Sequence, residues 1–225
     1  MKKYILSIFL IHLFLLSFVF AQDKIAVMIK SKGSVTIQQV KTGKKIAAKV
    51  GTVLMDGDKV ITGKRGFAAV RFLDDKSLIR IREKSVCTIE GKKQEDKIEK
   101  SIWVEIGSFF ASVFKPKGSF KVITPTSVAS IKGTKFWTIH QLNSGTMYIG
   151  IEGVVEVSNE KGKALMKAGE TTIVPSKDDA PLVRETKDSD FPEGAEDTMG
   201  QTLELEFEKA DGSKKQLKIE LQKKE

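Results

Sequence analysis

Apolar and polar residues alternate with a period of two along most of the chain between residues 67 and 175. The alternating segments are FAAVRFL (67–73), SLIRIREKSVCTIE (77–90), SFKVITP (119–125), TKFWTIHQL (134–142), TMYIGIEGVVEVS (146–158) and ETTIVP (170–175). A period of two places every second side chain on the same face of a strand, whereas a helix requires a period near 3.6. These segments are therefore predicted to be β-strands with one buried face.

Short polar segments separate the predicted strands. They are DGD (56–58), TGKRG (62–66), DDKS (74–77), LNSG (142–145) and NEKGK (159–163). The segment IWVEIGSFFASVF (102–114) is ambiguous by periodicity, but its β-branched and aromatic residues and Gly107 favour a strand over a helix. Short strands with a turn about every 8 to 12 residues predict an all-β fold, either a β-sandwich or a short solenoid-like stack.

Residues 201–225 contain two further alternating segments, which predict a C-terminal β-hairpin. Pairing Phe207 with Leu217 sets apolar residues opposite apolar residues and leaves a loop at 211–213. A two-stranded ribbon alone is marginally stable in water. Its apolar face is therefore expected to dock on the body of the protein or on a partner.

The N-terminal segment has the features of a secretory signal peptide. Two lysines precede an almost wholly apolar stretch from Tyr4 to Phe20, and Ala21 suits a cleavage site. Residues 1–21 are therefore predicted to be a signal peptide, and the protein is expected to be periplasmic or extracellular. The alternative is an uncleaved membrane anchor, because about 17 to 20 apolar residues can just span a bilayer.

Charge divides the rest of the chain into three parts. Residues 22–175 contain 27 lysines and arginines against 15 aspartates and glutamates, a net charge of +12. Residues 176–200 contain 3 against 8, a net charge of −5, and residues 201–225 contain six of each. Because the middle part also combines proline and glycine with little periodicity, it is predicted to be an acidic linker between a β domain and the hairpin.

Three arginines form a candidate site for an anionic partner. If the strands around them pair across a loop at Asp75-Lys76, Arg71 faces Arg80, and Arg82 lies on the same side. The apolar residues that then face the core are Val70, Phe72, Ile79 and Ile81. Facing like charges are unfavourable unless an acidic group lies between them, such as a carboxylate of the linker or an external anion. The alternative is a solvated face.

Few residues are available for catalysis or metal binding. Beyond the N-terminal segment the chain has one histidine, His140, and one cysteine, Cys87, so no His/Cys metal cluster, Cys–His pair or intramolecular disulfide can form. We expect no catalytic residues, no metal and no cofactor, and we expect Cys87 to be either a buried strand residue or a free thiol. Nucleic acid is not expected as a partner, because aromatic residues are few and are not interleaved with basic ones.

Five short motifs occur in an order that resembles the FecR domain. They lie in GTVLMDGDKVITGKRGFAAVRFLDDKSLIRI (51–81), SFKVITPTSVASIKGTKFWT (119–138), IGIEGVVEV (149–157) and LMKAGETTIV (165–174), so the resemblance covers about residues 32 to 174. Glycine allows positive φ or close backbone approach, Asp and Thr bond backbone N–H groups, and Pro ends a strand. We therefore expect a structural role in turns for Gly57, Asp58, Thr62, Gly63, Thr124, Pro125, Gly133, Thr134, Glu152 and Gly153.

The resemblance implies a role outside the cytoplasm. The matching part of FecR proteins is periplasmic and relays the state of an outer-membrane receptor to an inner-membrane regulator, and a cytoplasmic anti-sigma segment precedes a membrane helix. Only residues 1–3 precede the apolar stretch here, so the anti-sigma role is not expected to apply. The resemblance implies a non-enzymatic protein-binding or signal-sensing module whose partner is another envelope or secreted protein. The alternative is a binder of anionic cell-envelope polymer through the arginine face.

Overall fold

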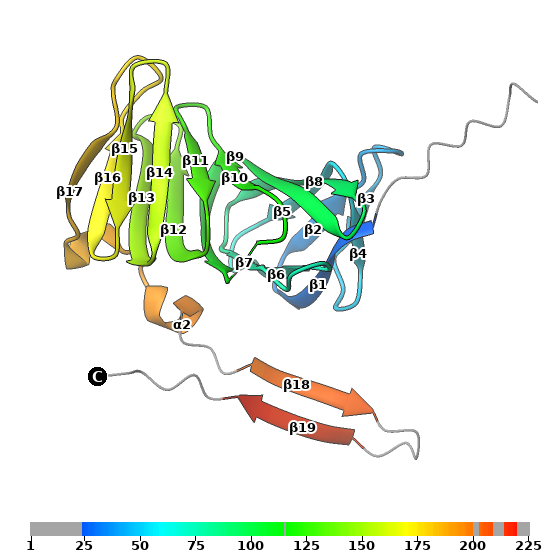
Figure 1. Cartoon of the computed structure of the whole chain (residues 1–225). Helices are drawn as coiled ribbons and strands as arrows, with labels where there is room; N and C mark the ends of the chain where they lie inside the picture. The colour runs from blue at the N-terminus through cyan, green and yellow to red at the C-terminus, as the bar shows by residue number, and fades with distance from the viewer. Residues whose placement is uncertain (1–23, 115, 200–202, 209–213, 220–225) are drawn as a thin grey trace, which may run out of the picture.

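The computed structural model describes residues 24–114, 116–199, 203–208 and 214–219, and in the last two ranges it describes only the backbone. Seventeen strands form a β-sandwich whose two sheets share one long strand, β9 (Lys97–Val113). In Figure 1, β10 to β17 lie toward one end of the sandwich and β1 to β8 toward the other, and β9 runs between these two ends. Each of the two layers contains strands from both ends. The predicted all-β fold is confirmed, and the sandwich is the architecture that the structure adopts.

One layer, sheet A, contains only antiparallel pairs. Its strands, in spatial order, are β4 (Val53–Met55), β1 (Lys24–Lys32), β6 (Phe67–Phe72), β7 (Leu78–Ile81), the C-terminal part of β9, β12 (Thr134–Gln141), β13 (Gly145–Glu152), β16 (Glu170–Val174) and β17 (Leu182–Glu185).

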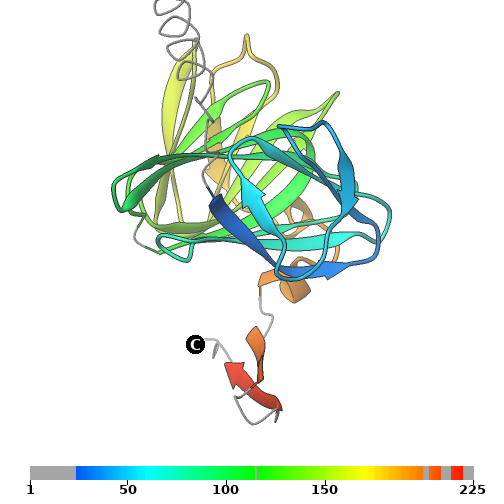
Figure 2. The ribbon, with the colours of Figure 1, turned by 90° about the vertical axis from the view of Figure 1, so that its right-hand side faces the viewer.

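The other layer, sheet B, is antiparallel except where β9 and β10 run parallel. Its strands, in spatial order, are β3 (Lys45–Ala47), β2 (Val35–Gln38), β5 (Asp58–Thr62), β8 (Val86–Gln94), the N-terminal part of β9, β10 (Phe120–Ile123), β11 (Val128–Ile131), β14 (Val154–Asn159) and β15 (Gly162–Lys167). Seen from the end that carries β1 to β5, the strands of the two layers enclose the interior (Figure 2).

The long strand β9 changes layer at Gly107. Residues before this point pair with β8 and β10 of sheet B, and residues from Gly107 onward pair with β12 and β7 of sheet A. Gly107 has φ +105°, and a Cβ there would lie 2.2 Å from Oγ of Ser85. Both the positive φ and the close approach require glycine at this corner.

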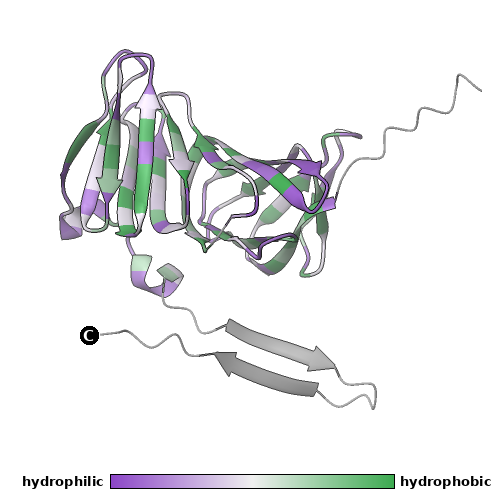
Figure 3. Cartoon of the chain, in the orientation of Figure 1, coloured by the Kyte–Doolittle hydropathy of each residue, from purple (hydrophilic) through white to green (hydrophobic). Residues whose placement is uncertain are grey.

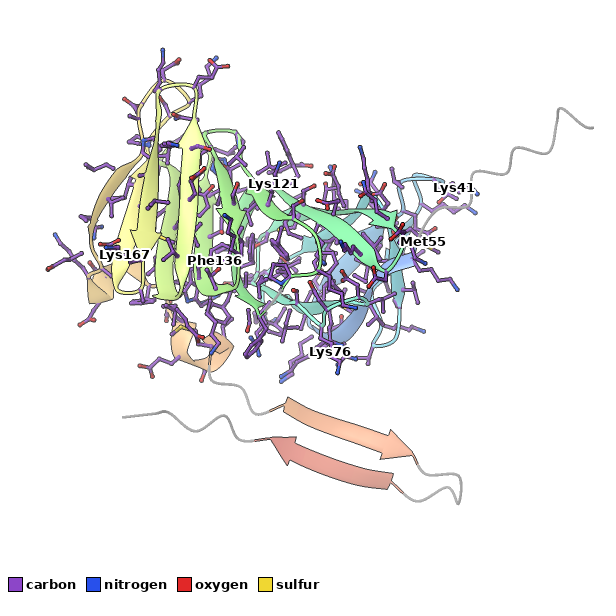
Figure 4. The ribbon with its side chains drawn as sticks, viewed as in Figure 1. Lys41, Met55, Lys76, Lys121, Phe136 and Lys167 are labelled. Carbon is purple, nitrogen blue, oxygen red and sulfur yellow. The ribbon has the colours of Figure 1, made fainter. Side chains whose placement is uncertain are left out.

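The main core lies between the two sheets. Strands of sheet B such as β5 alternate buried and half-exposed residues, as the period of two predicts. Hydrophobic and hydrophilic bands alternate along the strands in Figure 3. Phe136, labelled in Figure 4, is fully buried and belongs to this core. Each large apolar side chain buried in this way contributes about 1.5–3 kcal/mol.

The alternating segment 77–90 is divided between the two sheets. Its first part is β7 in sheet A, and its second part belongs to β8 in sheet B. The chain turns between them, where Lys84 has φ 54° and Thr62 accepts a hydrogen bond from the backbone N–H of Ser85 at 2.9 Å. Alternation alone does not reveal this corner, because both sheets bury the same side of the segment.

The segment predicted to be an acidic linker is structured, so this part of the prediction is wrong. It contains β17, which extends sheet A beside β16, a 3-10 turn, η1 (Asp188–Asp190), and a short helix, α2 (Ala195–Met199). Within the described part of the chain, no helix is long and apolar enough to cross a bilayer. The predicted signal peptide, residues 1–21, lies outside the described residues.

The predicted C-terminal hairpin is present, with a different register. Strands β18 (Leu203–Glu208) and β19 (Lys214–Ile219) pair antiparallel as a separate two-stranded sheet. Leu205 pairs with Leu217, and Phe207 pairs with Lys215 rather than Leu217. The shift of two residues keeps the same alternation of faces, so hydrophobic alternation alone does not distinguish the two registers. Docking of this hairpin remains a prediction.

A candidate binding face on the outside of sheet A

A second apolar cluster lies on the outer face of sheet A, away from the main core. Phe110, Trp137 and Ile149 are adjacent in the register of β9, β12 and β13, and all three are buried. Partly buried Ile139 and Met147 pack against them. Sheet A is therefore covered on both faces in this region, which explains why β12 has consecutive buried residues and five buried residues of eight.

Two of the three predicted arginines border this cluster. The guanidinium of Arg80 lies 5.8 Å from the ring centroid of Phe110, and that of Arg82 lies 5.9 Å from the ring centroid of Trp137. Such cation–π contacts stabilise a desolvated cation more than an exposed one. We call the surface formed by Arg80, Arg82, Phe110, Trp137 and Ile149 the aromatic–arginine face.

The predicted facing of Arg71 and Arg80 is wrong by two residues. In the structure Arg71 is opposite Leu78, and Arg80 is opposite Ala69. Alternation is preserved, so the predicted core residues are confirmed, namely Val70, Phe72, Ile79 and Ile81.

The register differs because the turn between β6 and β7 is centred on Asp74-Asp75 rather than on Asp75-Lys76. Asp74 and Asp75 in this turn point inward and both bind the buried ammonium group of Lys100.

Residues 188–199, here called the covering segment, pack over the aromatic–arginine face. Three of its residues, Phe191, Ala195 and Met199, belong to the outer apolar cluster or pack against it. Nη2 of Arg82 donates a hydrogen bond to the carbonyl of Glu193. The sequence suggested that a carboxylate of the acidic segment could lie beside the arginines. In the structure the acidic segment does contact Arg82, but through a backbone carbonyl rather than a carboxylate.

One ion pair anchors the covering segment to the edge of sheet A. Arg184 of β17 binds both carboxylate oxygens of Asp190, at 2.7 and 2.6 Å. Thr171 and the backbone N–H of Lys187 also donate to this carboxylate. Hydrogen bonding to Arg184 lowers the pKa of Asp190 to about 2, although partial burial opposes the shift. Asp190 is thus ionised at neutral pH.

Two cavities flank Arg82, one on each side of the covering segment. The first has a volume of about 350 Å³ and is lined by Lys32, Arg65 and Arg82 on one wall and by Asp197 of the covering segment on another. The second, of about 310 Å³, is lined by Arg82, His140 and other residues. Arg82 is therefore accessible from both margins of the covering segment.

Two motif residues in turns bind the backbone, and one of them holds Arg82. Asp58 is buried and accepts hydrogen bonds from the N–H groups of Val40, at 3.0 Å, and Met55, at 2.9 Å. Thr62 donates to the carbonyl of Arg82 at 2.5 Å. The side chain of Thr62 thus fixes the backbone at the corner from which Arg82 reaches the aromatic–arginine face.

A buried network of hydroxyl groups connects the two sheets near the Thr-Pro motif. Oγ1 of Thr146 lies 2.9 Å from Oγ1 of Thr124, 2.7 Å from Oγ1 of Thr126 and 2.9 Å from Nδ1 of His140. Burial lowers the pKa of His140, although a backbone contact with Gly145 opposes the shift. The imidazole is therefore neutral at pH 7, and it is buried in the network.

The other motif residues lie in turns or at the strand ends beside them, such as Thr134 at the start of β12 and Glu152 at the end of β13. Gly133 and Gly153 have φ +115° and +80°, and a Cβ on Gly153 would lie 2.5 Å from the carbonyl oxygen of Gly133. Glu152 pairs with Lys135 at 2.6 Å on the surface, and Thr134 is buried. Gly57 has a positive φ of +83°, and a Cβ on Gly63 would lie 2.8 Å from Oγ of Ser34. Pro125 is exposed in the turn that follows β10.

The described residues offer little catalytic chemistry. No group of three or more His, Cys, Asp or Glu side chains among them could hold a metal ion. Cys87 is fully buried in the main core, and burial raises the pKa of its thiol to about 12. A thiol with that pKa is not a nucleophile at neutral pH.

Sequence reasoning missed the aromatic part of the face and its cover. Phe136-Trp137 and Phe109-Phe110 place large apolar residues on both faces of their strands, and this signal could have indicated a sheet buried on both sides. The four-residue spacing of Phe191, Ala195 and Met199 could similarly have indicated an apolar side to the acidic segment.

Residues 58–156 match the family model described as FecR protein. Two crystal structures of a protein described as a putative anti-sigma factor from Parabacteroides distasonis are similar in fold. The structure at 1.65 Å resolution has a TM-score of 0.50 and 18% identity, and the structure at 2.50 Å has a TM-score of 0.49 and 17% identity. In both cases the similarity covers 57% of this chain and 60% of the other, so this chain spans about three fifths of their length. No curated protein matches the sequence.

Proposed function

This chain carries a domain of the FecR family, and from that premise we propose that it is an extracytoplasmic, non-enzymatic module that senses a signal by binding another protein of the cell envelope. FecR domains are generally periplasmic, and the apolar N-terminal stretch supports export of this one. The proposed partner is an envelope or secreted protein, and the proposed response is a change in that interaction rather than a chemical reaction.

The observation that carries the proposal is the aromatic–arginine face. Aromatic residues and arginine are enriched at the interfaces between proteins, whereas lysine is depleted there. Here Arg82 lies over Trp137, Arg80 lies over Phe110, and Thr62 of a family motif fixes the carbonyl of Arg82. The motif residues thus support a surface with the composition of a protein-binding site.

Affinity capture from an envelope extract tests this function. The chain from Gln22 onward, immobilised through a C-terminal tag, is expected to retain a specific envelope protein that is absent from a control column carrying an unrelated basic protein. Truncation at residue 200 is expected to weaken retention if the hairpin also contributes. If the column retains only the proteins found on the control column, the proposed function is wrong.

The second candidate is a binder of anionic envelope polymer, and the charge of the body supports it. The body carries +12, and exposed lysines such as Lys41, Lys121 and Lys167 are spread over the molecule (Figure 4). Co-sedimentation with purified wall material should then fall steeply between low and high salt. Replacement of Arg71, Arg80 and Arg82 by Ser should abolish it if the arginine face is the site, and should leave it nearly unchanged if the dispersed lysines are.

A further inference from the structure

We propose that the aromatic–arginine face is a docking site for an acidic segment of a partner protein, and that the covering segment occupies this site as an internal competitor. The inference rests on the proposed function, because it names the surface that binds the partner and the chemistry of the partner's segment. It also provides regulation, because the site becomes available only when residues 188–199 leave it.

An acidic segment with apolar residues already lies on the aromatic–arginine face. Residues 188–199 contain five acidic residues and no basic one, whereas the body on which they lie carries +12. Phe191, Ala195 and Met199, spaced by four, supply the apolar contacts to the cluster around Trp137. The face therefore accommodates a segment that is acidic and carries apolar residues at this spacing.

The covering segment leaves the arginines of the face incompletely paired. Arg80 is only 6% exposed, yet among the described residues no carboxylate forms an ion pair with it or with Arg82. Nη1 of Arg82 is buried without a hydrogen-bond partner among those residues, and Nη2 binds only a backbone carbonyl. Burial lowers the pKa of Arg80, as expected for a desolvated cation.

This incomplete pairing leaves room for a better ligand. A desolvated guanidinium is costly without an anion, and a carboxylate that binds it through two parallel hydrogen bonds is among the stronger polar contacts in proteins. A partner segment that presents a carboxylate to Arg82 would gain a contact that the covering segment does not make, while it retains the apolar contacts to Trp137.

Arg82 can be reached through the two cavities that it lines. Both cavities beside Arg82 open at the margins of the covering segment, where Pro192 lines one and Gly194 and Thr198 line the other. The larger cavity is lined by four basic residues, Lys30, Lys32, Arg65 and Arg82, and by two acidic residues, Glu83 and Asp197, so its lining is net positive. An incoming acidic segment can therefore begin to bind at the margin before the covering segment has left.

The covering segment is suited to displacement. It has one turn of 3-10 helix and a five-residue α-helix, and among the described residues its side-chain ion pair is the one between Arg184 and Asp190. Short elements with few buried contacts open locally at low free-energy cost. Because the covering segment is part of the same chain, its effective concentration at the face is about millimolar. It therefore competes strongly with a partner segment that is free in solution. Weakening its apolar contacts should therefore unmask the site.

The test uses the chain from Gln22 onward and a fluorescein-labelled synthetic peptide with the sequence of residues 186–199 as the probe, with binding measured by fluorescence anisotropy. The opened variant is Phe191→Ser with Met199→Ser. The matched control is Leu182→Ser, which removes an exposed apolar side chain from the edge of the same sheet. The opened variant should bind the peptide at least about tenfold more tightly than the unaltered chain, which corresponds to about 1.4 kcal/mol. The control should bind it as the unaltered chain does.

Charge dependence separates the proposed recognition from non-specific apolar binding. A peptide with every Asp and Glu replaced by Asn and Gln should bind the opened variant at least about tenfold more weakly, and so should the acidic peptide when Arg82→Gln is added. Circular dichroism verifies that each variant is folded. The inference is overturned if the folded opened variant does not bind the acidic peptide, or if it binds the neutral peptide equally well.

The inference and the proposed function can fail separately. If an envelope protein is captured equally by the unaltered chain and by Arg82→Gln, the proposed function stands and this docking site is wrong. If the peptide binds as expected but no envelope protein is captured, the docking chemistry stands and the proposed function is wrong.

Discussion

Lys100, which is buried, forms an ion pair with the nearly buried side chain of Asp74, with 2.6 Å between Nζ and Oδ2, and this pair joins β9 to the turn between β6 and β7. A carboxylate oxygen of Asp75 lies 2.8 Å from the same nitrogen, and the carbonyl oxygens of Ile98 and Lys117 lie 3.1 and 3.0 Å from it. Burial acts to raise the pKa of Asp75, but its bonds to Lys100 and Ser77 outweigh this, and the pKa is lowered.

Replacing Lys100 by Met should therefore destabilise the protein strongly, because two buried carboxylates lose their counter-ion. We expect a loss of about 3–5 kcal/mol in the free energy of unfolding, measured by urea denaturation at pH 7. The control is Lys117→Met, whose pair with Asp96 is 3.5 Å long and solvent-exposed, and which should cost less than about 1 kcal/mol. Equal effects of the two substitutions would contradict a structural role for the buried pair.

The pair of Arg184 and Asp190 predicts that acid opens the covering segment. The pKa of Asp190 is lowered from 3.8 to about 2, so its contribution to the closed state is complete above about pH 4 and is lost as the pH falls toward 2. In a Trp103→Phe background, fluorescence reports Trp137 alone, which is fully buried when the segment is closed. Quenching by acrylamide should therefore rise between pH 4 and 2.

Asp190→Asn is the matched variant for this measurement. It keeps the shape of the side chain but cannot form the ion pair, so it should show stronger quenching of Trp137 than the unaltered chain already at pH 7. The difference between the two proteins should disappear near pH 2. A constant difference across this range would show that Asp190 does not act through its charge.

The periodicity of the sequence predicted the strands well because both sheets bury one face of most strands against a common core. The core residues Val70, Phe72, Ile79 and Ile81 followed from alternation alone. The exact pairing of Arg71 did not, because a shift of two residues leaves every side chain on the same face. The turn that joins β6 to β7 in the observed register also makes a long-range contact to Lys100, which local pattern does not contain.

The candidate site was predicted only in part for a similar reason. The sequence indicated that three arginines share the outer side of β6 and β7, but it did not indicate that Trp137 and Phe110 lie beside them. Those residues come from strands far along the chain, and only the order of strands in sheet A brings them together. The many acidic residues in 176–200 led to the prediction of a linker. The three apolar residues that pack on the face, Phe191, Ala195 and Met199, are widely spaced and gave only a weak signal beside this charge.

Removing the hydroxyl of Thr146 should lower the stability of the protein, although Thr and Val have nearly the same size. This hydroxyl contacts Thr124, Thr126 and His140 in a buried site, so Thr146→Val would leave several polar groups without their partner. We expect a cost of about 1–3 kcal/mol, measured by thermal or urea unfolding. Tyr148→Phe removes a hydroxyl at the margin of the same network, where it bonds Ser127 at 3.0 Å and also Thr124, and it should cost about 1 kcal/mol. A Thr146→Val effect smaller than that of Tyr148→Phe would show that the network adds little.

Two glycines with the same backbone conformation separate strain from steric clash. Gly153 and Gly169 both have φ +80°, but a Cβ on Gly153 would lie 2.5 Å from the carbonyl oxygen of Gly133, whereas nothing lies within 4 Å of a Cβ on Gly169. Gly169→Ala should therefore cost only the left-handed backbone penalty of about 1–2 kcal/mol. Gly153→Ala should cost clearly more, because the clash is with backbone and cannot be relieved by moving a side chain. Urea denaturation of both variants measures the difference, and equal costs would mean that the turns at Gly133 and Gly153 are not held against each other in solution.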